Sequence, residues 1–126
     1  MNLKMKQALE TMIWYAKADR LGATDGAQCV YRERGSNKRC VIGCLFDDAA
    51  LDLLDARGLS GDVVGALYTE FSNLGELLGL TLAQAEELQG HHDGTNFDLP
   101  EQRDAFIAAL EDIASGRVTG MDGVRF

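Results

Sequence analysis

The sequence predicts a mainly helical α+β domain of about five helices with one small antiparallel β-hairpin after the first helix. Three observations lead to this prediction. Apolar residues recur at helical spacing over most of the chain, glycines separate the periodic segments, and one stretch rich in Val, Tyr and Ile surrounds the turn sequence GSNK. The 126 residues are enough for one core, so 1–126 is expected to be a single domain.

The first helix is predicted over residues 4–19. Leu9, Met12, Ile13 and Ala16 follow the i, i+3, i+4, i+7 pattern of a buried stripe. The hairpin comes next, with residues 27–33 paired with 38–43, since Gly, Ser and Asn between two β-type runs favour a turn.

Helices are then predicted from Asp47 to Gly58, within 61–79, and over 81–90. The second of these has a break near Ser72-Asn73. The third begins with a capping box, in which Thr81 precedes Gln84 by three residues.

The last helix is predicted to begin at Asp98 as its N-cap, with Pro100 in the first turn and Gly116 as its end. The tail, 117–126, is interrupted by glycines and is compatible with a loose end or with a further strand.

The charge is unevenly distributed along the chain. Residues 1–44 carry 8 Lys and Arg against 4 Asp and Glu, whereas residues 45–126 carry 4 against 16, which gives the net charge of -8. This asymmetry concerns partners rather than fold. It favours a protein partner with a basic groove over direct binding of nucleic acid, because an acidic surface repels phosphates.

No apolar run is long enough to cross a membrane, and the N-terminus lacks a signal-peptide core. Three cysteines, an odd number, argue against a complete disulfide framework and favour a reducing compartment, so we expect a cytoplasmic location.

The stretch RCVIGCLFDD raises three alternatives for Cys40 and Cys44. With Cys29 and a histidine they could bind zinc; this is weakly supported because only one knuckle-like spacing is present. Cys44 could be a nucleophile near a helix start, with His91 or His92 as base. The preferred interpretation is a structural join between hairpin and helix, formed by Cys40, Gly43 and Cys44.

A second candidate site binds anions. Arg32, Arg34, Lys38 and Arg39 lie on the predicted hairpin, where guanidinium groups could hold phosphate or carboxylate, and His92 and Asp93 could reach it from a helix end. The alternative is that the arginines pair with the chain's own carboxylates. No metal or other cofactor is predicted. Asp93 is not expected to orient His92, because adjacent side chains rarely align as base and orienting acid.

Three motifs together resemble a group of small proteins encoded by tailed bacteriophages. They are a Cys-x-Tyr-Arg segment at residues 29–32, a Cys-x-Ile-Gly-Cys-Leu segment at 40–45, and a Leu-Gln-x-x-His-Asp segment at 88–93, followed by a final amphipathic helix. The likeness extends over residues 29–115. It implies a phage setting, and therefore the host cytoplasm, but no particular activity.

We therefore expect an accessory protein that binds and inhibits a host factor, plausibly of a bacterial defence system, without catalysis. The alternative is a sponge that sequesters a nucleotide-type signal. A small cysteine- or metal-dependent enzyme is the third hypothesis. A homo-oligomer is compatible with each.

Overall fold

The computed structural model describes residues 1–25 and 28–126. The prediction of a mainly helical α+β domain is confirmed. Within the described residues, the helices are α1 (Leu3–Lys17), α2 (Asp48–Ala56), α3 (Val64–Glu70), α4 (Leu74–Leu78), α5 (Leu82–Asp93) and α6 (Pro100–Ala114), together with the 3₁₀ turn η1 (Gly43–Leu45). The short strands are β1 (Thr24–Asp25), β2 (Gln28–Cys29), β3 (Gly120–Met121) and β4 (Val124–Arg125).

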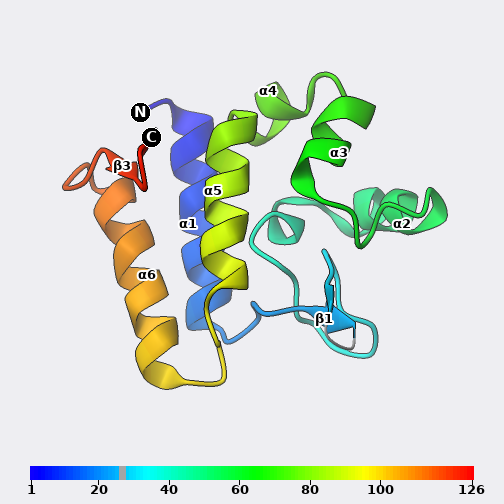
Figure 1. The fold of residues 1–126 in the computed structure, drawn as a ribbon, viewed down its shortest axis with the longest axis horizontal. Coiled ribbons are helices and arrows are strands. Elements are labelled where there is room, and N and C mark those ends of the chain that lie inside the picture. Colours follow the sequence, from blue (N-terminus) through cyan, green and yellow to red (C-terminus); the bar gives the residue numbers. More distant parts are fainter. Residues whose placement is uncertain (26–27) are drawn as a thin grey trace.

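Three long helices form one half of the molecule. In Figure 1, α1, α5 and α6 lie side by side, and α2, α3 and the β1–β2 pair lie on the other side of α5, with α4 between the two groups. The helix α1 packs against α6 and η1, and α3 packs against α5. Both chain termini lie at the same end of the long helices. Segments from distant parts of the sequence pack against the two central helices: α4, α6 and η1 against α1, and α3 and β4 against α5.

One hydrophobic core joins the two halves. The apolar side chains along one face of α1 and of α6 are buried in this core. Burial of such apolar surface is the main favourable contribution to folding. Within the described residues, no helix combines the length and apolar character needed to cross a bilayer. The largest side chains with almost no exposure are Leu9, Met12, Leu21, Val41, Ile42, Leu51, Leu67, Leu80, Leu88, Phe106, Leu110 and Ile113.

Two helix starts follow the sequence signals. An Asp47 side-chain oxygen accepts a hydrogen bond from the Ala50 N–H at 2.8 Å, which caps α2. The capping box at α5 is confirmed: the Gln84 N–H donates to Thr81 Oγ1, and the Thr81 N–H donates to Gln84 Oε1. These caps satisfy N–H groups that have no partner within the helix.

The predicted cap of α6 is wrong. Leu99, not Asp98, is the N-cap residue, and its side chain makes no capping hydrogen bond. Asp98 lies one residue earlier, where its N–H donates to Asn96 Oδ1 at 3.0 Å. Pro100 occupies the first turn as predicted, because proline lacks an N–H that the first turn leaves unpaired.

The predicted end of α5 at Gly90 is also wrong, since the helix continues to Asp93 and Gly94 is its C-cap. A glycine inside a helix costs about 1 kcal/mol relative to alanine. Burial of His92 in the extra turn offsets that cost, because its ring packs against Phe97 and Phe106. The longer helix brings the His92 ring to the backbone of Gly22, while Asp93 stays exposed.

The predicted hairpin of 27–33 with 38–43 is wrong, although residues 26–27 lie outside the described part. The strand β1 pairs instead with β2, and between the two predicted strands there is one antiparallel bridge, Arg32 with Arg39. Val41 and Ile42 are both fully buried. Successive side chains of a strand point to opposite faces, and a two-stranded hairpin that packs on the core by one face would bury only one of these two residues. The chain instead turns into η1, where both are buried.

The C-terminal segment forms a hairpin. Of the two possibilities for residues 117–126, a loose end or a further strand, the structure shows the strand. The strand β3 pairs with β4 in antiparallel register, and Asp122 and Gly123 both have positive φ at the turn, as two-residue hairpin turns require. The side chain of Gln84 donates to the Arg125 carbonyl at 2.9 Å, which ties this hairpin to α5. The predicted helix within 61–79 is divided into α3 and α4.

Candidate functional site

The join between the Tyr31 segment and η1 is closely packed. A Cβ atom at Gly43 would lie 2.0 Å from the Tyr31 carbonyl oxygen, so only glycine fits there without a backbone shift. The Gly43 N–H donates to Cys40 Sγ at 3.2 Å, and the Cys44 thiol donates to the Val41 carbonyl at 3.0 Å. The structure places Cys40, Gly43 and Cys44 together, in the core.

The Cys44 environment is unsuited to nucleophilic catalysis. Burial raises the pKa of its thiol well above the ordinary value, and Cys40 raises it further. A catalytic cysteine needs a lowered pKa and access to substrate. Among the described residues no group of three His, Cys, Asp or Glu side chains could hold a metal ion. The Cys29 side chain, which the zinc hypothesis needs, lies outside the described part.

Two of the four predicted anion-binding residues are bound to α2. Arg32 donates to Asp52 at 2.8 Å and to Asp55 at 2.5 Å, and these bonds raise its pKa. Arg39 donates to Asp48 and to the carbonyl of Phe46. Arg32 and Arg39 therefore pair with the chain's own carboxylates, as the alternative interpretation proposed. Their positive charge is then less available to bind a phosphate.

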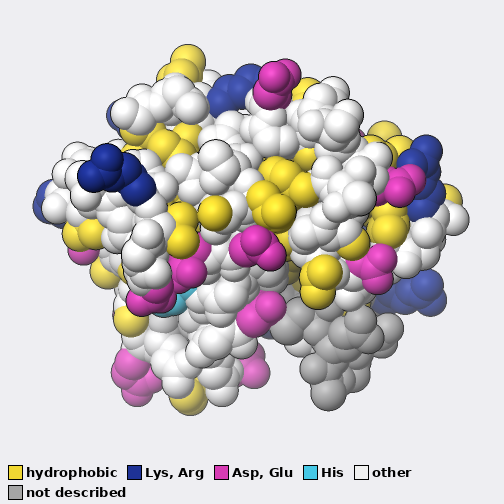
Figure 2. Space-filling model, turned by 45° about the horizontal axis from the view of Figure 1, so that its top comes forward, with side chains coloured by type: hydrophobic (Ala, Val, Ile, Leu, Met, Phe, Trp, Pro, Cys, Tyr) yellow, Lys and Arg dark blue, Asp and Glu magenta, His cyan; other side chains and the backbone are white. Residues whose placement is uncertain are grey.

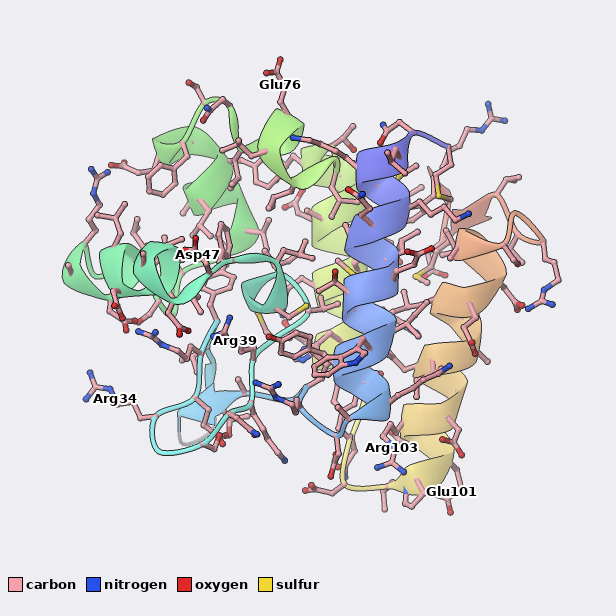
Figure 3. The ribbon with its side chains drawn as sticks, turned by 180° about the vertical axis from the view of Figure 1, so that it is seen from behind. Arg34, Arg39, Asp47, Glu76, Glu101 and Arg103 are labelled. Carbon is pink, nitrogen blue, oxygen red and sulfur yellow. The ribbon has the colours of Figure 1, made fainter. Side chains whose placement is uncertain are left out.

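The other two predicted residues lie apart from them. Arg34 is exposed at the end of its loop and extends away from the body of the protein, while Arg39 lies closer to it (Figure 3). Lys38 lines a cavity of about 360 Å³ together with Glu33, His92 and Asp93. The structure therefore separates the four basic residues, and only Lys38 shares a cavity with His92 and Asp93.

His92 is buried and uses both ring nitrogens. Nε2 lies 3.1 Å from the N–H of Gly22, which can only donate, so Nε2 is the unprotonated nitrogen. Nδ1 then carries the proton and donates to Asp93 Oδ1 at 3.1 Å. Gln89 donates to the same carboxylate oxygen at 2.7 Å. The expectation that Asp93 would not orient His92 is wrong, because the last turn of α5 brings the adjacent side chains into contact. The neutral imidazole ties α5 to Gly22.

A second cleft, which we call the acidic cleft, lies between α5 and the loop before α3. Its volume is about 260 Å³. Its described walls combine aliphatic side chains, three carboxylates and no Lys or Arg, and Gly90 leaves open space where another residue would place a Cβ. The described lining is Val30, Tyr31, Cys40, Gly61, Asp62, Val63, Val64, Glu86, Gln89, Gly90 and Asp93.

The acidic cleft is held in shape by Tyr31. This buried ring donates its hydroxyl to the Asp62 carbonyl at 2.7 Å, and burial raises its pKa. Glu86 and Asp62 are exposed, and neither forms an ion pair among the described residues. The sequence did not point to either residue, because they lie 24 positions apart in segments that only the tertiary fold brings together. The sequence offered one signal for this cleft: Glu86 and Asp93 are seven residues apart, a spacing that places two side chains on the same face of a helix.

Comparison with family models, with curated proteins and with solved structures found no match. A function is therefore inferred from the contacts and charges of the chain itself.

Proposed function

We propose that the protein is a non-catalytic accessory protein of phage type that binds a host protein of a bacterial defence system and inhibits it. The observation that carries the proposal is the acidic cleft. It presents the exposed carboxylates of Asp62 and Glu86 with no Lys or Arg among its described lining residues, so a Lys or Arg side chain of a partner would pair with them.

The walls of the cleft suit such a side chain. Lys and Arg have apolar stems, which can lie along Val30 and Val63 while the charged group reaches the carboxylates. Figure 2 shows Asp and Glu side chains both near the middle and toward the edges of that view, and Lys and Arg mainly toward its edges. A net charge of -8 also speeds the approach of a basic partner.

The nucleotide sponge is the weaker candidate because Arg32 and Arg39 already bind carboxylates of α2. An enzyme is weaker still, because the Cys44 thiol is buried with a raised pKa and His92 has both nitrogens engaged.

A charge-reversal pair tests the proposal. Glu86→Lys places a cation in the acidic cleft, whereas Asp104→Lys makes the same charge change at an exposed position on α6. A tetra-arginine peptide is titrated into each variant, and amide shifts are followed by NMR. We expect shifts at Asp62 and Glu86 in the parent chain and in Asp104→Lys, with about tenfold weaker binding to Glu86→Lys, since loss of a charge pair costs about 1.4 kcal/mol or more.

The same two variants are then used as bait in bacterial lysate. A host protein retained by the parent chain and by Asp104→Lys, but not by Glu86→Lys, supports the proposal. Equal retention by all three, or peptide-induced shifts remote from the cleft, would show that the acidic cleft is not the binding surface.

A further inference from the structure

A second surface lies at the C-terminal end of α1 and has the opposite chemistry. Trp14 is 56% exposed, which is unusual for the largest side chain and the only tryptophan of the chain. Its ring meets that of Tyr15 edge to face, with centroids 5.2 Å apart. The guanidinium of Arg20 lies 5.5 Å from the Trp14 centroid and 4.8 Å from that of Tyr15. We call Trp14, Tyr15 and Arg20 the aromatic–arginine cluster.

The end of α1 positions Arg20. The Asp19 N–H donates to the Ala16 carbonyl and the Arg20 N–H to the Tyr15 carbonyl, with Asp19 at a φ of 57°. This is a Schellman motif, which reverses the chain after the last turn and folds Arg20 back over the rings. Helical periodicity did not reveal the cluster, because Arg20 lies beyond the helix.

The cluster is also fixed from the other side. Arg20 Nε donates to the Asn37 carbonyl at 3.4 Å, and the Arg39 N–H donates to the Arg20 carbonyl at 2.9 Å. Arg20 forms no ion pair with a carboxylate of the described residues. Figure 3 shows Arg39 on one side of the C-terminal half of α1 and Arg103 on the other. A fixed guanidinium without a carboxylate in the described part of the chain is therefore presented on two aromatic rings.

We infer that the aromatic–arginine cluster docks an acidic, partly apolar segment of a protein partner. Trp, Tyr and Arg are the residue types that dominate binding energy at protein interfaces. Charge complementarity selects an acidic segment, because the Arg20 guanidinium lies on the two rings and forms no ion pair with a carboxylate of the described residues.

The shape and the total charge decide against other ligands. Small ligands usually bind in concave pockets. Trp14, Tyr15 and Arg20 line neither the acidic cleft nor the cavity beside Lys38 and His92, so the cluster suits a macromolecule rather than a small ligand. The balance of -12 over residues 45–126 opposes a long polyphosphate but leaves a short acidic segment free to dock locally.

The test uses a short fluorescein-labelled peptide, Glu-Glu-Leu-Glu, with binding measured by fluorescence anisotropy on the full chain. We expect Trp14→Gln and Arg20→Gln each to weaken binding about tenfold or more. Lys6→Gln removes the same charge from an exposed position earlier on α1 and is expected to change affinity less than about twofold. Glu86→Lys leaves this binding within the same limit, which separates it from binding at the acidic cleft.

Three results would overturn the inference. The first is equal weakening by Lys6→Gln and Arg20→Gln, which would show attraction to charge alone. The second is binding of an oligothymidylate of the same length as tightly as the peptide, which would make the cluster a nucleic-acid surface. The third is no binding of the peptide below about 1 mM. Circular dichroism of each variant verifies the fold.

Discussion

Substitution of Gly43 by alanine is expected to be among the most damaging small changes in this protein. The added Cβ would lie 2.0 Å from the Tyr31 carbonyl oxygen, well inside an ordinary contact, and the atom that it meets is backbone and cannot rotate away. The two segments must therefore separate. That carbonyl accepts the hydrogen bond of the Cys40 N–H at 3.3 Å, and Gly43 itself donates to Cys40 Sγ.

The magnitude is set by these contacts. Overpacking of a tight core typically costs about 1–3 kcal/mol, and a weakened buried hydrogen bond costs about 1 kcal/mol more. We expect Gly43→Ala to lower the free energy of unfolding by about 2–4 kcal/mol, a large part of the roughly 5–15 kcal/mol of a typical domain. In urea, with a slope of about 1.5 kcal/mol/M, the midpoint should fall by about 2 M.

Gly90→Ala is the matched control. A Cβ at Gly90 meets nothing within 4 Å, and the position is helical, so alanine should leave stability unchanged or raise it by up to about 1 kcal/mol. A free energy of unfolding for Gly43→Ala within about 0.5 kcal/mol of the parent chain would refute the prediction, since the two segments would then not be in the contact described.

The remaining predictions concern the thiols and the pH dependence. In a Cys29→Ser background, Cys40 and Cys44 should react with Ellman's reagent slower by roughly two orders of magnitude or more in the native state than in urea, because both are buried; rapid reaction of one native thiol would revive the enzyme hypothesis. A hydrogen bond with Asp122 raises the pKa of Glu87, so that contribution to stability is present at acid pH and is lost as pH rises through the raised pKa. Glu87→Gln should therefore be more stable than the parent chain at pH 7 but not at pH 4. The measurement is the urea midpoint of the variant minus that of the parent chain, and an equal difference at the two pH values would contradict the prediction.

The two proposed surfaces make different demands on a partner. The acidic cleft calls for a basic side chain, and the aromatic–arginine cluster calls for an acidic segment. The helix α1 is nearer the viewer in Figure 3, and α5, which carries Glu86, is nearer in Figure 1. One partner could meet both surfaces only by wrapping around the long helices, so the variants Glu86→Lys and Arg20→Gln separate two binding events.

Local signals in the sequence predicted the helices well. The spacing of Leu9 and Met12, the capping box at Thr81 and the proline at position 100 each act within a few residues, so they do not depend on which distant segments meet. The same kind of signal failed at Gly90, where a glycine looked like a helix end. There the burial of His92 against two phenylalanines outweighed the local cost of glycine.

The candidate site was less predictable because its contacts join distant segments. Sequence proximity grouped Arg32 and Arg39 as partners in anion binding, but the fold gives each of them to a carboxylate of α2. In the same way, nothing local joins Asp62 to Glu86.

By itself, the sequence determined a mainly helical chain with an uneven charge, since periodicity, caps and composition are properties of neighbouring residues. Only the tertiary structure decided which charges are neutralised and which face solvent. The pairing of charges depends on which distant segments the fold brings into contact, as for Arg32 and Arg39 with α2. In the same way, the burial of both Val41 and Ile42 shows that packing overrides a local strand preference.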